Sequence, residues 1–104
     1  MARILVHEPD PDLRALFAHV LSRLGHEVVL TGDGGVDAAL VEPGDAEGRA
    51  VLRSLRTAIP PVPVVCVSVY SADEEVGALG PSAYLTKPVT SLALGSALTA
   101  ALAV

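Results

Sequence analysis

Two polar side chains stand at or just after the ends of apolar runs that predict β-strands. Val62–Val69 is a β-branched run with Ser68 near its end, and Lys87 follows the short run Ala83–Thr86. A continuous apolar run is typical of a strand buried on both faces of a parallel sheet. Ligands of open α/β sheets bind at the carboxyl ends of the strands. We therefore expect Ser68 and Lys87 to lie together at a functional edge. No His or Asp base accompanies Ser68 in the pattern, so a nucleophilic role is not expected.

The elements that position this edge alternate along the chain. The apolar spacing predicts helices at 11–24, 46–58, 73–79 and 91–103, with Asp10 as an N-cap before Pro11. It predicts strands at 3–7, 26–31, 36–41, 62–69 and 83–86. Strands that alternate with helices give a doubly wound parallel α/β sheet with right-handed crossovers. At 104 residues, we expect a single domain over 1–104.

Charge and composition exclude several kinds of function. The chain has seven basic and twelve acidic residues, which gives a net charge of −5. Because the basic residues are also scattered along the sequence, a nucleic-acid surface is not expected. The start of the chain is neither a signal peptide nor a membrane span. Cys66 lies inside an apolar run, which indicates an inert buried thiol in a reducing, cytoplasmic compartment. With 51% hydrophobic and 18% charged residues, we expect an exposed apolar patch and self-association.

Four segments follow one another at a characteristic spacing. They are Ile4–Arg14, the turn Leu24–Val28, the strand that ends in Ser68, and Tyr84–Pro88. Together they resemble the receiver domain of two-component response regulators, over nearly the whole chain. The resemblance implies a CheY-like, flavodoxin-like sheet of five parallel strands in the order 2-1-3-4-5.

The resemblance also implies roles for residues at the strand ends. In this family, an aspartate after the third strand accepts a phosphoryl group, beside a magnesium ion held by an acidic pair after the first. Ser68 matches the hydroxyl and Lys87 the lysine that hold the phosphoryl oxygens. Tyr84 matches the aromatic residue that reports the switch, and Pro88 a proline that is usually cis.

Three positions depart from the family pattern. Glu8 and Pro9 stand where the acidic pair is expected, and Glu42 stands at the acceptor position. Magnesium is usually held by one or two carboxylates plus phosphate, and Pro9 has no side-chain oxygen. The extra methylene of Glu42 displaces an acyl phosphate by about 1 Å, and phosphoryl transfer depends on positioning. We expect doubtful magnesium binding, no phosphorylation in the usual way, and a Glu42–Lys87 pair that imitates part of the charged state. The alternative is an inherited polar cluster.

The connection between the second and third strands is short. Only the six residues Gly32–Asp37 lie there, where the family has a helix. A parallel crossover usually needs a dozen or more residues, but six reach the roughly 18 Å required if they are nearly extended. Asp33-Gly34 could instead form a hairpin, the hinge could favour a domain swap, or residues 35–42 could be a helix. We favour the strand Val36–Val41, which keeps Glu42 at the acceptor position.

These observations lead to three hypotheses for the function. The first is an atypical receiver, not an enzyme, that works by contact with a protein partner such as a histidine kinase or an output protein. The second is a phosphorylation-competent receiver in a phosphorelay, with Asp45 or Asp10 as a non-standard acceptor. The third is a structural dimerisation module. Because a helix is missing and the one at Asp73–Leu79 is short, we also expect an uncovered sheet face, which a second copy or a partner covers.

Overall fold

The computed structural model describes residues 2–32 and 35–103. In this part of the chain, the strands form one parallel sheet in the order β2-β1-β3-β4-β5. This is the predicted flavodoxin-like order. The strands are β1 (Arg3–His7), β2 (Glu27–Val29), β3 (Ala38–Val41), β4 (Val64–Ser68) and β5 (Ala83–Thr86).

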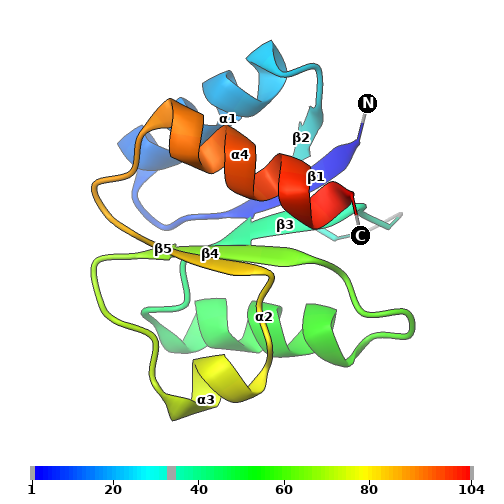
Figure 1. Cartoon of the computed structure of the whole chain (residues 1–104), viewed down its shortest axis with the longest axis vertical. Coiled ribbons are helices and arrows are strands. Elements are labelled where there is room, and N and C mark those ends of the chain that lie inside the picture. The colour runs from blue at the N-terminus through cyan, green and yellow to red at the C-terminus, as the bar shows by residue number, and fades with distance from the viewer. Residues whose placement is uncertain (1, 33–34, 104) are drawn as a thin grey trace.

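Helices cover both faces of the sheet (Figure 1). α1 (Pro11–Arg23) and α4 (Ser91–Leu102) lie on one face, and α2 (Ala46–Thr57) and α3 (Glu74–Ala78) lie on the other. Each helix begins at a side chain that accepts a backbone N–H of its first turn, which satisfies a donor that has no partner within the helix. These N-caps are Asp10, Asp45, Asp73 and Thr90. No helix in the described ranges combines the length and the hydropathy that a membrane crossing requires.

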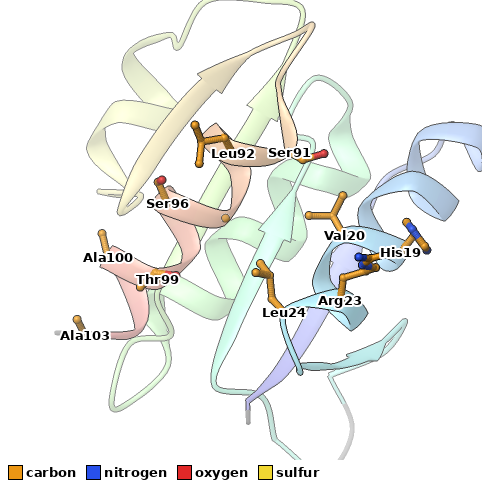
Figure 2. A pocket seen from close by; sticks show the side chains of 11 residues that line it. His19, Val20, Arg23, Leu24, Ser91, Leu92, Ser96, Thr99, Ala100 and Ala103 are labelled. Carbon is orange, nitrogen blue, oxygen red and sulfur yellow. The ribbon is translucent and has the colours of Figure 1, made fainter.

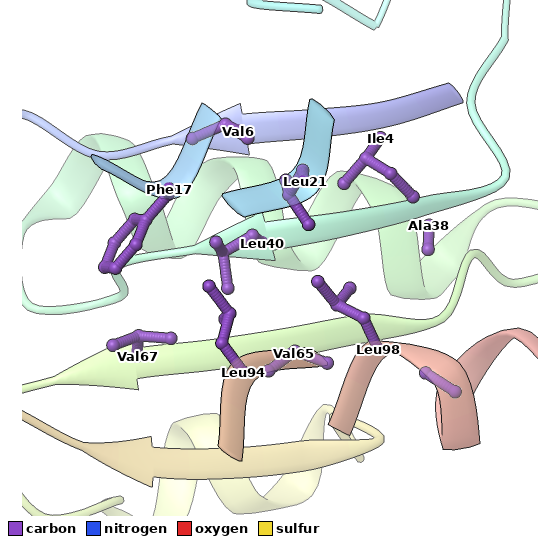
Figure 3. Close-up of a cluster of buried hydrophobic side chains, with 11 residues drawn as sticks. Ile4, Val6, Phe17, Leu21, Ala38, Leu40, Val65, Val67, Leu94 and Leu98 are labelled. Atoms are coloured by element: carbon purple, nitrogen blue, oxygen red, sulfur yellow. The ribbon is translucent and has the colours of Figure 1, made fainter. Parts of the chain in front are cut away.

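Each sheet face has its own apolar core. The larger core packs α1 and α4 on the sheet (Figure 3), with the buried side chains Ile4, Val6, Phe17, Leu21, Ala38, Leu40, Val65, Val67, Leu94, Leu98 and Ala101. The second core lies under α2 and α3, with Leu5, Ala39, Val41, Leu52, Val64, Cys66 and Val76. β3 and β4 contribute to both cores, which is why their sequences are continuously apolar.

The short connection after β2 contains no helix within residues 30–32 and 35–37. β3 is a strand and pairs with β1 in parallel, so the hairpin and the helix over 35–42 are both wrong. The hairpin signal Asp33-Gly34 itself lies outside the described residues. The prediction of an uncovered sheet face is also wrong at the centre of the face under α2 and α3, because Leu5 there is only 5% exposed. Val36, in the connection where the family has a helix, packs against this core.

Some predicted boundaries and burials are wrong. β2 is shorter than 26–31, and Leu30 is 65% exposed. α2 ends at Thr57, one residue before the predicted end, and Ile59 beyond it is 98% exposed. Leu16 and Leu24 continue the apolar stripe of α1 but are about half exposed, at 48% and 49%. The apolar face of α1 is therefore wider than the surface it buries.

Candidate functional site

The sheet register brings four polar side chains to one edge. At the carboxyl ends of the strands, His7 of β1 pairs with Val41 of β3, and Ser68 of β4 pairs with Thr86 of β5. Each of Glu8, Glu42 and Lys87 follows one of these strands directly. The predicted site residues Glu8, Glu42, Ser68 and Lys87 therefore meet at the predicted edge.

Glu42 and Ser68 form a buried pair. The Ser68 hydroxyl donates a hydrogen bond to Glu42 Oε1 at 3.1 Å. Ser68 is fully buried, and Glu42 is 9% exposed. The backbone N–H of Tyr70 donates to Ser68 Oγ at 3.2 Å, so the hydroxyl is fixed from both sides. The serine to which the resemblance assigns a phosphoryl oxygen thus donates to a carboxylate of this chain.

Lys87 pairs with Glu8, whereas the sequence predicted a pair with Glu42. Lys87 Nζ lies 2.7 Å from Glu8 Oε1, and the two side chains are 13% and 3% exposed. The other oxygen, Glu8 Oε2, accepts the backbone N–H of Asp10 at 3.1 Å. The longer side chain of a glutamate and the long lysine stem let this pair form over the intervening strand ends. The predicted Glu42–Lys87 pair is wrong, although Lys87 still acts on Glu42 through its charge.

The donor set does not fit the magnesium ion that the resemblance implies. Pro9 provides no side-chain oxygen, and both oxygens of Glu8 already have partners. Glu42 Oε1 is occupied by Ser68, and Glu42 Oε2 is buried without a hydrogen-bond partner among the described residues. Within 2–32 and 35–103, no group of three or more His, Cys, Asp or Glu side chains forms a metal site. One free carboxylate oxygen is far from the set of hard oxygen ligands that magnesium prefers.

Burial changes the acidity of two groups at this edge. Loss of solvent raises the pKa of Glu42 above its ordinary value, although the Ser68 hydrogen bond and the Lys87 charge both act to lower it. Burial, with a smaller contribution from the Glu42 charge, raises the pKa of the Cys66 thiol to about 12. Cys66 is fully buried, so it is the inert thiol that the sequence predicts.

Solved structures with the same architecture include a receiver domain and response regulators. A CheY-like response regulator receiver domain from Methanospirillum hungatei has a TM-score of 0.87 and 23% sequence identity, over 99% of this chain and 94% of that one. NtrX from Brucella abortus, in a complex with ADP, has a TM-score of 0.84 and 25% identity over 98% of this chain. A response regulator from Thermotoga maritima has a TM-score of 0.82 and 16% identity, with 98% of each chain covered.

The chain has the receiver-domain fold. It spans 26% of the length of NtrX, whose remaining parts have no counterpart in this sequence. A scan against protein-family models gives no match, and neither does a search of curated proteins.

Two further positions of the receiver fold lie beside the site. Tyr84, at the position of the switch aromatic, is half-buried, and its hydroxyl donates to the backbone oxygen of Tyr70 at 2.7 Å. Tyr70 is itself bonded to Ser68, which links Tyr84 to the Glu42–Ser68 pair. The peptide bond between Lys87 and Pro88 is cis, as the resemblance implies.

Two glycines of this receiver fold were not recognised from the sequence as part of the site. A Cβ on Gly48, in the first turn of α2, would lie 1.9 Å from the backbone oxygen of Glu42. A Cβ on Gly44 would lie 2.7 Å from Glu42 Oε1. Both glycines allow the chain to pass close to Glu42. The sequence signal was their position after the third strand, with Gly44 in the loop and Gly48 in the first turn of the helix that follows.

Proposed function

We propose that this chain is an atypical receiver module that signals by protein contact and does not use the phosphoryl switch. The observation that carries the proposal is that the two buried carboxylates already occupy the groups that would hold phosphoryl oxygens. Ser68 donates to Glu42 at 3.1 Å, and Lys87 lies 2.7 Å from Glu8. A phosphoryl group would have to displace both contacts.

The geometry supports a fixed polar state at the strand ends. Phosphorylation adds negative charge and acceptor oxygens, and it acts by creating charge-assisted contacts to groups that lacked them. Here a hydroxyl and an ammonium have such contacts without modification. Tyr84 is tied to the same network through Tyr70. The module therefore holds one arrangement of this edge and presents a constant surface to its partner.

Asp10 and Asp45, the two aspartates considered as alternative phosphoryl acceptors, are N-caps of helices. Asp10 accepts the N–H groups of Asp12 and Leu13, and Asp45 accepts that of Gly48 at 2.7 Å. Each carboxylate therefore satisfies the N-terminus of a helix. These bonds favour the contact module over a receiver with a displaced acceptor.

The proposed module has a cytoplasmic location and no catalytic activity.

The test uses acetyl phosphate, a small phosphoryl donor, with magnesium and the intact chain. Intact-mass spectrometry is expected to show no gain of one phosphoryl group. A matched variant, Glu8→Asp/Pro9→Asp/Glu42→Asp, restores the acidic residues of the family pattern and serves as the control. Stoichiometric phosphorylation of the wild type would overturn the proposal, and mapping of the modified residue would distinguish Glu42 from Asp10 and Asp45.

A further inference from the structure

A groove separates α1 from α4 on the outer surface of the molecule (Figure 2). Its volume is about 860 Å³. Val20 of α1 and its C-cap Leu24 lie on the side that faces α4, and His19 and Arg23 line the margin farther from α4. Except for Leu92, the side of α4 is lined by short side chains, those of Ser91, Gly95, Ser96, Thr99, Ala100 and Ala103. The groove lies on two helices and shares no lining residue with the Glu42–Ser68 site.

The outward face of α4 lacks the polarity of a solvated helix. The sequence of α4, SLALGSALTAAL, has no charged residue. Leu94, Leu98 and Ala101 face the core, while Leu92 on the outside is 82% exposed. A surface helix normally presents charged residues to water. An uncharged outward face next to an apolar groove is typical of a surface that contacts another molecule.

The shape of the groove favours a partner other than a second copy. A symmetric dimer uses the same patch on both chains, so the patch must complement itself. Here the patch is hollow because the side chains of Ser96, Thr99 and Ala100 are small. Two hollow surfaces placed face to face would leave unfilled space, which loses packing contacts. The groove instead fits a convex element that carries large apolar side chains.

The charges at the groove also favour a partner other than a second copy. Among the described residues, His19 and Arg23 are the ionisable ones that line the groove, and none of its lining residues is Asp or Glu. A symmetric dimer would bring two such patches together without a carboxylate to pair with Arg23. A partner with carboxylates would meet Arg23 across the rim, since complementary charge favours encounter and register.

We propose that this groove binds an amphipathic helix of another protein. The helix places large apolar side chains at positions i, i+3, i+4 and i+7 in the groove. It carries carboxylates along the flank that faces Arg23 and His19. This inference adds a docking surface to the proposed function but does not rest on it, because the groove is separate from the strand-end site.

The experiment titrates the isotope-labelled chain with two synthetic helices and follows backbone amide signals. Each peptide has about 16 residues, with leucines at the spacing given above and the same lactam bridge on its back face, which keeps a short helix folded. One peptide has Glu along one flank, and the other has Lys at the same positions. The acidic peptide is expected to shift signals of α1 and α4 and to bind about fivefold tighter at low salt.

A charge reversal tests the assignment of the rim. Arg23→Glu is expected to remove or reverse the preference for the acidic peptide. Arg53→Glu is the matched control, because Arg53 is exposed on α2, on the opposite face, and is expected to keep the preference. Both variants are first compared with the wild type by their amide spectra.

Three outcomes would overturn the inference. The first is the absence of α1 and α4 shifts up to millimolar concentrations of either peptide. The second is equal binding of the two peptides with no effect of Arg23→Glu. The third is a concentration-dependent dimer, seen by sedimentation, that Leu92→Glu dissociates, which would assign the groove to a second copy. None of these outcomes depends on whether the chain accepts a phosphoryl group.

Discussion

The strand-end site and the α1–α4 groove differ in whether their side chains have partners within the chain. At the strand ends, Ser68, Glu8 and Lys87 are buried or nearly so and have partners within the chain. At the groove, Leu24 and Leu92 are exposed, and α4 presents no charge. The polar edge at the strand ends is paired internally, while the open surface lies on two helices. The comparison indicates that the polar side chains at the strand ends find their partners within the chain, whereas the groove leaves apolar, uncharged surface exposed to solvent.

The largest expected effect comes from opening the buried ion pair. Lys87→Met leaves Glu8 buried without its cation, and such a change costs about 3–5 kcal/mol of unfolding free energy. The double variant Glu8→Leu/Lys87→Met is expected to regain most of this loss. Urea denaturation measures both variants. A loss for Lys87→Met no larger than that for the exposed Arg53→Met would show that the site is not closed as described.

The second prediction concerns the approach of α2 to the site. Gly48→Ala places a Cβ against the backbone oxygen of Glu42, so the first turn of α2 must shift, at a cost of about 2–3 kcal/mol. Gly77→Ala in α3 is the matched control, because a Cβ there meets nothing within 4 Å. The control is expected to be neutral or slightly stabilising. Equal thermal midpoints for the two variants would contradict the close packing at Glu42.

The third prediction concerns the acidity of Glu42. Because its pKa is raised in the folded state, its ionisation costs stability as pH rises above the ordinary value of 4.5 and through the folded pKa. Glu42→Gln keeps an oxygen for the Ser68 hydroxyl but has no charge. We expect the variant to be more stable at neutral pH by about 1 kcal/mol. Denaturation between pH 4 and 8 checks this, and a wild-type stability that rises over this range relative to the variant would contradict it.

The smallest effect on stability is expected at the groove. Leu92→Ser changes a side chain that is 82% exposed, so the unfolding free energy should stay within about 0.5 kcal/mol of the wild type. Its affinity for the acidic peptide is nevertheless expected to fall severalfold. Leu94→Ser, at a neighbouring buried position, is the contrast and should strongly destabilise the fold. Unchanged peptide affinity of the Leu92→Ser variant would show that Leu92 is not part of the contact face.

Local signals made most of the fold predictable. Asp10 before Pro11 gave the first residue of α1, and the apolar spacing gave that of α4 at Ser91. The bounds predicted for β1 and β5 match the structure. These elements depend on capping groups and apolar runs that lie within a few residues of each other. The strand order came from the resemblance, since pairing between distant strands is not a local property.

The site was predicted in its members but not in its pairing. The strand ends bring Glu8, Glu42, Ser68 and Lys87 together, as expected. Which carboxylate Lys87 reaches depends on side-chain length and on the bond that Ser68 makes, and neither is set by sequence spacing. The groove was not predicted at all, because it arises from the relation of two helices and not from either sequence alone.

The most direct test of the closed site is an amide NMR titration of the wild-type chain with magnesium and beryllofluoride, which stands in for a phosphoryl group. Our account predicts no change at Glu8, Glu42, Ser68 and Lys87. Their other polar atoms already have partners, and the one free carboxylate oxygen among these described residues, Glu42 Oε2, is too few ligands to hold magnesium. Saturable shifts clustered at these four residues would show that the site opens and accepts the ion, which would contradict the account.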